Sequence, residues 1–110
     1  MVTVTLVRGG GVMRGFRVKG HAGFAASGTD IVCAAVSSAA YLTANTVTDV
    51  LGIDAKPTVS DSRMELMLTK PQAELAQTTL QGFALHMREL AKTFPQNIRV
   101  IYGGVHHDEN

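Results

Sequence analysis

An alanine-rich apolar run from Ile31 to Leu51 contains no helix-breaking residue, and the next glycine is Gly52. Such a run predicts one long helix, with Asp30 as its N-cap and Gly52 as its left-handed C-terminal cap. Most residues between Ala34 and Thr48 have small side chains. Because small side chains let a helix approach a sheet or another backbone closely, we expect this helix to be deeply buried.

Two hairpins and a final strand are predicted around this helix. Val2, Val4 and Leu6 alternate with threonines, which is typical of a half-buried strand, and the three glycines at 9–11 suit a tight reversal. In the strand that follows, we expect one face to carry Arg14, Phe16 and Val18, and the other to carry Met13, Arg17 and Lys19. Segments 57–59 and 64–68 predict the second hairpin, and residues 98–102 predict the last strand.

A second helix is predicted over residues 72–93. Its apolar positions, 76, 80, 83, 87, 90 and 94, form an amphipathic stripe. The order of elements predicts an α/β two-layer sandwich, in which two helices cover one face of a mixed five-stranded sheet. The chain is expected to be a single domain over residues 1–110. The other sheet face and the strand edges would be exposed to solvent unless another chain covered them. We therefore predict a homodimer.

Composition excludes several classes of protein. Of the 110 residues, 45% are hydrophobic and the net charge is +1, which argues against disorder and against a strong basic field for nucleic acid. Polar residues interrupt the run from Ile31 to Leu51, and the start lacks a signal peptide, so neither a membrane partner nor export is expected. A single cysteine excludes an internal disulfide and favours a cytoplasmic location. Arg14, Arg17 and Lys19 form a small basic strip, which is either a solvated face or a contact for RNA or an acidic precursor.

The cysteine, Cys33, lies twelve residues after His21. With Asp30 as N-cap, Cys33 would fall in the first helical turn, where free N–H groups and the helix dipole favour a thiolate. The imidazole of His21 could accept the thiol proton, which would make a catalytic dyad. The alternatives are a buried, inert cysteine and a structural histidine.

The segment Gly20–Gly23, followed by the segment Gly28–Ser37, resembles the signature of the bacterial ribosomal-processing cysteine proteases, the Prp (YsxB-like) family. The resemblance continues more weakly through a helix at residues 80–90 and a strand at residues 95–100. It implies a cysteine endopeptidase that removes the N-terminal extension of the precursor of ribosomal large-subunit protein twenty-seven. It also implies a homodimer, and we expect no cofactor.

The resemblance implies a set of site residues. Cys33 would be the nucleophile and His21 the general base, supported by Asp30 and Ser37. The residues of the substrate loop would be Gly20, Ala22, Gly23, Phe24 and Gly28. Backbone N–H groups near Val32 and Cys33 are candidate donors to an oxyanion.

Two supporting roles stay open. Asp30 caps the helix, orients the imidazole, or does both. Ser37 either bonds the helix backbone or supplies a hydrogen bond within the site.

A second hypothesis belongs to a different class: a non-catalytic, dimeric, ribosome-associated module in which Cys33 is structural. The tail from His106 to Glu109 has the composition of a metal-binding tract. One such cluster without distant ligands is weak evidence for metal binding, so we predict no metal site.

Overall fold

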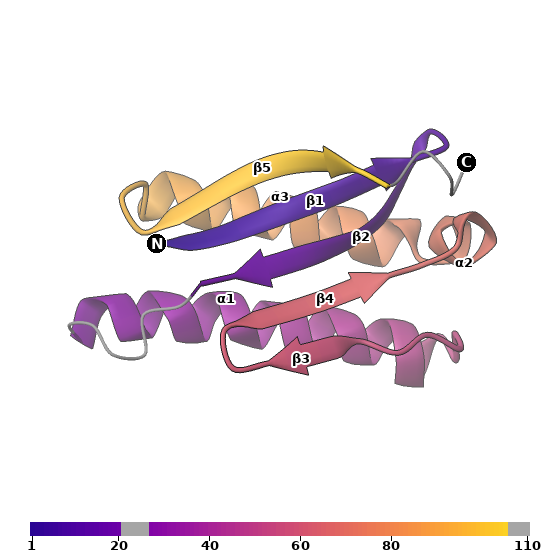
Figure 1. Ribbon diagram of the computed structural model, residues 1–110, viewed down its shortest axis with the longest axis horizontal. Helices are drawn as coiled ribbons and strands as arrows, with labels where there is room; N and C mark the ends of the chain where they lie inside the picture. Colours follow the sequence, from indigo (N-terminus) through magenta and orange to yellow (C-terminus); the bar gives the residue numbers. More distant parts are fainter. Residues whose placement is uncertain (21–26, 106–110) are drawn as a thin grey trace.

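The computed structural model describes residues 1–20 and 27–105, and for residues 27–30 it describes the backbone. In this part of the chain five strands form one sheet and the helices lie together beside it (Figure 1). The strands are β1 (Val2–Gly9), β2 (Val12–Lys19), β3 (Thr58–Ser60), β4 (Arg63–Met67) and β5 (Ile98–Gly104). The helices are α1 (Ser27–Asn45), which continues into the π-helical turn η1 (Thr46–Val50), α2 (Lys70–Leu75) and α3 (Gln77–Thr93).

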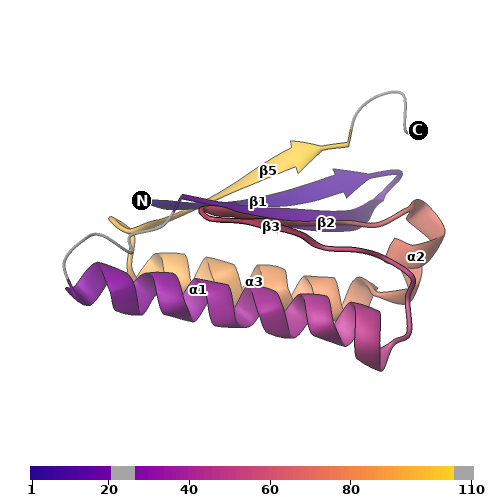
Figure 2. The same ribbon diagram turned by 60° about the horizontal axis from the view of Figure 1, so that its bottom comes forward.

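The sheet has the order β3-β4-β2-β1-β5. Strands β1 and β5 are parallel and the other neighbours are antiparallel, so the sheet is mixed, as predicted. Figure 2 shows α1 and α3 on the same face of this sheet. Gly10 and Gly11 have φ values of 65° and 83°, the left-handed backbone that a two-residue reversal between β1 and β2 requires.

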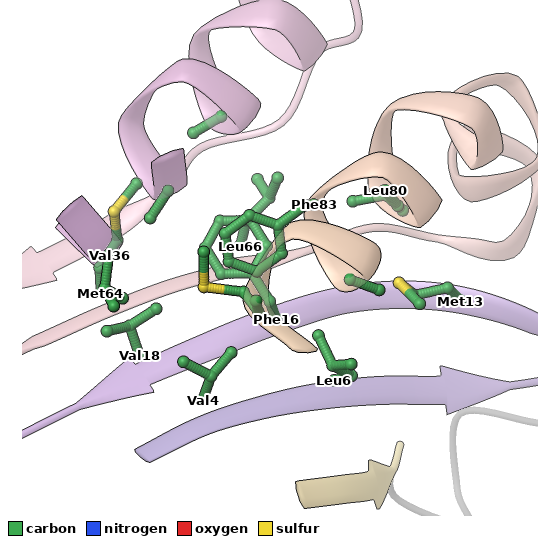
Figure 3. Close-up of a cluster of buried hydrophobic side chains, with 14 of the residues drawn as sticks. Val4, Leu6, Met13, Phe16, Val18, Val36, Met64, Leu66, Leu80 and Phe83 are labelled. Carbon is green, nitrogen blue, oxygen red and sulfur yellow. The ribbon is translucent and has the colours of Figure 1, made fainter. Parts of the chain in front are cut away.

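The hydrophobic core lies between the sheet and the helices (Figure 3). The rings of Phe16 on β2 and Phe83 on α3 pack with their centroids 4.4 Å apart. The predicted stripe of the second helix supplies much of the core, since its members Ala76, Leu80, Phe83 and Met87 are buried. The amphipathic spacing therefore identified the correct face of α3.

The predicted faces of β2 were partly wrong, because a β-bulge changes its alternation. The register pairs Val7 with Gly15 and then Arg8 with Met13, which leaves Arg14 as the extra residue. In a regular strand, Met13 and Phe16 would lie on opposite faces, because they are three residues apart. The bulge places both in the core. Arg14 is buried, and its Nε donates to the backbone oxygen of Leu68 at 2.7 Å.

The start of α1 also differs from the prediction. The helix begins at Ser27, so Asp30 lies within its first turn and is not the N-cap. The weakest helix former between these residues is Gly28, which costs about 1 kcal/mol relative to alanine and does not stop a helix. At the other end, Gly52 has a φ of 69°, in agreement with the predicted left-handed cap.

The deep burial predicted for this helix was wrong. Only six of the 20 residues of the segment Ile31–Val50 are buried, although by length and composition alone the segment is apolar enough to cross a membrane. The core helix of a water-soluble protein passes the same test. Helix α1 packs on the sheet through one face and beside α3, and its outer surface leaves Ile31 and Leu42 each 68% exposed.

The predicted helix over residues 72–93 is two helices, α2 and α3, which meet at Ala76. Thr69 and Gln72 form a capping box that starts α2. The side chain of Gln77 accepts from the backbone nitrogen of Met13 at 3.2 Å and donates to its oxygen at 2.7 Å. These two bonds attach the start of α3 to β2 beside the bulge, a long-range contact that helical periodicity does not reveal.

Candidate active site

Cys33 lies in the second turn of α1 and its side chain is half-buried. Ser37, also half-buried, and the exposed Tyr41 follow at intervals of four residues, so the three side chains share one flank of the helix. Val32 and Val36 are buried against the core beside this flank. The flank therefore carries a partly exposed cysteine on a helix that is packed against the core.

The position of Cys33 changes the expected electrostatics. In a helix that begins at Ser27, the backbone N–H groups without a helical partner belong to the first turn. Because Val32 and Cys33 are inside the helix, their N–H groups are used by the helical hydrogen bonds. The prediction that they donate to an oxyanion was therefore wrong, and the dipole effect at the thiol is weaker than a first-turn position would give.

A cavity of about 110 Å³ opens beside the same flank, between α1 and the β3–β4 hairpin. Its residues come from three elements: Ser37, Ala40 and Tyr41 of α1, Val18 of β2, and the hairpin segment from Val59 to Met64. Sequence reasoning missed the hairpin part of this site, because residues 60–63 predicted a turn and nothing more. The available signal was Val59, an apolar side chain on a short strand with polar neighbours.

The end of β2 is fixed beside this cavity. The backbone nitrogen of Gly20 donates to the oxygen of Ser62 at 2.9 Å, and Ser62 lines the cavity together with Ser37. Gly20 has a φ of 78°, and a Cβ there would lie 2.8 Å from the oxygen of Met1, so the position suits only glycine. The residue directly before His21 in the sequence is thus attached to the rim of the cavity.

The predicted site residues are placed unequally. Cys33 and Ser37 share a flank, and Gly20 is linked to the cavity that this flank lines. The backbone of Gly28 and Asp30 is helical. His21, Ala22, Gly23 and Phe24 lie outside the described residues, so the dyad remains a prediction.

A second groove, of about 290 Å³, lies on the other flank of α1, where the helix meets α3. It is lined by Ala39, Leu42, Thr43 and Thr46 of α1 and by Thr78, Thr79, Gly82, Phe83 and His86 of α3. None of these described lining residues carries a thiol or a carboxylate. Its walls combine apolar groups, including the ring of Phe83, with four threonines and one exposed imidazole.

The basic strip does not form as the sequence suggested. Arg17 pairs with Glu65 of β4 across the sheet, and Arg14 is bonded to the backbone of Leu68. Lys19 is exposed at the end of β2. Among the residues that the structure describes, no group of three or more His, Cys, Asp or Glu side chains could hold a metal ion.

Solved structures with the same fold include cysteine proteases. The protein SMU.848 of Streptococcus mutans matches with a TM-score of 0.80 at 26% identity, over 96% of each chain. The essential ribosomal processing protease Prp of Staphylococcus aureus, in complex with a substrate peptide, matches with a TM-score of 0.76 at 21% identity, over 93% of this chain and 99% of that one. Its complex with a covalently linked product peptide matches with a TM-score of 0.73 at 23% identity, with the same coverage.

No match was found among curated proteins. The model of one protein family, cysteine protease Prp, matches residues 1–99, which include Cys33 and every strand and helix up to the start of β5. The chain therefore belongs to the Prp family of cysteine proteases.

Proposed function

We propose that this protein is an endopeptidase that removes the N-terminal extension of the precursor of ribosomal large-subunit protein twenty-seven during ribosome assembly. The observation that carries the proposal is the family match over residues 1–99, which includes the half-buried Cys33 on the same helix as residues that line a cavity. The similar S. aureus protein is described as a ribosomal processing protease and was crystallised with a substrate peptide. A peptide of this kind enters the site best when it is extended, as an N-terminal extension is.

The proposed reaction uses Cys33 as nucleophile and His21 as general base. His21 accepts the thiol proton, and the sulfur attacks the scissile carbonyl carbon to give a tetrahedral intermediate. The intermediate collapses to a thioester as the C–N bond breaks, and the imidazolium returns the proton to the leaving amine. Water, deprotonated by His21, then hydrolyses the thioester and restores the thiol. Asp30 and Ser37 are proposed to support these two groups.

The substrate proposal is tested by incubating the purified protein with the extended ribosomal precursor and, separately, with casein. Mass spectrometry of the products is expected to show one cut in the precursor, next to apolar residues, and none in casein. Cuts at many bonds of casein, with the precursor intact, would overturn the proposal of a narrow substrate specificity. The assignment of the protein as a cysteine protease would not be affected.

Alkylation separates a catalytic thiol from a structural one. A thiolate activated by His21 reacts with iodoacetamide below pH 7, whereas an inert core cysteine reacts when the fold opens. We expect fast alkylation of the folded protein at pH 6, followed by mass spectrometry. A rate that rises only with denaturant would favour the non-catalytic, ribosome-associated module.

We also propose that the protein is a cytoplasmic homodimer. The uncovered sheet face, on which the dimer prediction rested, carries threonines and the Arg17–Glu65 ion pair together with the partly buried Ile101 and Met67. The outer surface of the helix layer is more apolar, with exposed Ile31, Leu42 and Leu85. Two copies packed through this surface would remove these side chains from water.

A further inference from the structure

Val59 is an apolar side chain on the edge strand of the sheet. It pairs with Met64 of β4, and because directly opposed residues share a face, both side chains lie on the side of the helices. Val59 remains 52% exposed, while Met64 is buried. The strand therefore extends past the core and presents Val59 to the cavity next to α1.

The cavity combines an apolar interior with a polar rim. Its inner wall is formed by the buried side chains of Val18, Ala40 and Met64. Its remaining lining residues on the hairpin and α1 are mostly polar: Ser37, Ser60, Asp61, Ser62 and Arg63. Ligand sites of this type hold an apolar group inside and bind polar groups at the mouth. An extended peptide offers both, with an apolar side chain for the interior and backbone amides for the rim.

The distance from Cys33 fixes which part of a peptide reaches the cavity. At a rise of about 1.5 Å per residue, Ser37 lies roughly 6 Å and Tyr41 roughly 12 Å from Cys33 along α1. An extended peptide advances about 3.3 Å per residue. The cavity therefore lies about two to four peptide residues from the bond that Cys33 would attack.

We propose that this cavity is a specificity pocket, which binds an apolar side chain two to four residues from the scissile bond and rejects charged ones. The inference rests on the proposed function, because it needs a peptide substrate. Val59 is the residue that determines this preference, since it is the exposed part of the apolar lining on the hairpin side. Tyr41 lines the facing wall on α1.

The test changes charge on the two faces of one strand. In Val59→Lys the ammonium group enters the pocket, whereas in Thr58→Lys it lies on the opposite face, next to its pairing partner Glu65. Peptides derived from the precursor carry an apolar residue, alanine or glutamate at each position two to four residues from the cut. KM and kcat are measured for each peptide, and the rate of iodoacetamide alkylation of Cys33 reports on the nucleophile alone.

For Val59→Lys we expect KM for the apolar peptide to rise at least about tenfold, as for a lost contact in an apolar pocket. The alkylation rate should not change, and at one position the glutamate peptide should become the better substrate. Thr58→Lys should behave like wild type. Equal KM values for the two variants, or no gain with glutamate, would overturn the specificity pocket although cleavage persists. If wild type cleaves none of the peptides, the proposed function fails and the pocket assignment fails with it.

Discussion

Helix α1 has two flanks that resemble each other in composition and differ in what they contact. The flank that faces the β3–β4 hairpin carries Cys33 and, further along it, Ser37 and Tyr41, which line the smaller cavity. The flank that faces α3 carries Ala39 and Leu42 beside the larger groove. The cysteine therefore lies on the flank away from α3, although both flanks carry hydroxyl side chains.

This difference assigns separate tasks to the two flanks. Substitutions on the hairpin flank are expected to change turnover with little effect on stability, because its side chains are only partly buried. Substitutions in the groove between the other flank and α3 are expected to change stability or association, because this groove includes the packed ring of Phe83 on α3. The four predictions below test this separation.

The largest effect is expected for Cys33→Ala on the hairpin flank. Turnover of the precursor should fall below detection because the nucleophile is lost, while alanine, small and helix-favouring, should keep the thermal midpoint close to that of wild type. Product is measured by mass spectrometry and stability by circular dichroism. Ser38→Ala, on the exposed surface of the same helix, is the matched control. Turnover retained by a clean Cys33→Ala preparation would remove Cys33 as the nucleophile.

Phe83→Ala tests the opposite flank. It removes the ring packed against Phe16 and should lower the free energy of unfolding by about 3–5 kcal/mol. Urea denaturation measures the loss, and the alkylation rate of Cys33 in the folded protein should stay unchanged. A change in that rate without loss of stability would show that the two flanks are not independent.

Leu42→Glu tests the outer surface of the helix layer. A carboxylate in an apolar interface is costly, so the dissociation constant of the dimer should rise by more than about tenfold. Sedimentation across a range of concentrations measures it, with Asn45→Glu, on the same exposed surface, as a control for charge. Equal dissociation constants for the Leu42→Glu and Asn45→Glu variants would place the interface elsewhere. A monomeric wild type would contradict the dimer proposal.

The smallest effect is expected for Ser37→Ala. Loss of one supporting hydroxyl should lower kcat by a few-fold, about the value of one hydrogen bond, and leave the unfolding midpoint unchanged. Steady-state kinetics on the precursor measures it, and Ser37→Thr, which keeps the hydroxyl, should recover part of the loss. Unchanged kcat in the alanine variant would restrict Ser37 to a role in the helix or in the cavity wall.

The fold was largely predictable because its elements follow from local patterns. Alternation located the strands, paired glycines located the first reversal, and the stripe of the second helix identified its buried face. The β-bulge at Arg14 and the break at Ala76 were not predictable, since both depend on contacts between distant segments. Gln77, which bonds to Met13, is the clearest case.

The candidate site was predictable only in part. The single cysteine and the segment Gly28–Ser37, which resembles the family signature, identified Cys33 and Ser37 as candidates. The start of the helix was misplaced because aspartate is a strong N-cap residue and Gly28 looked like part of a loop. The hairpin wall of the cavity lies more than twenty residues beyond Cys33 in the sequence, and only the sheet pairing of Val59 with Met64 brings it near.

The position of Tyr41 has a spectroscopic consequence. The chain has two tyrosines and no tryptophan, so its ultraviolet emission comes from Tyr41 and Tyr102. Tyr102 accepts a hydrogen bond from Arg88 at 3.0 Å on β5, at the opposite edge of the sheet from β3. In a Tyr102→Phe variant the remaining fluorophore would belong to the wall of the cavity beside Cys33. Its emission would follow peptide binding in an unlabelled protein.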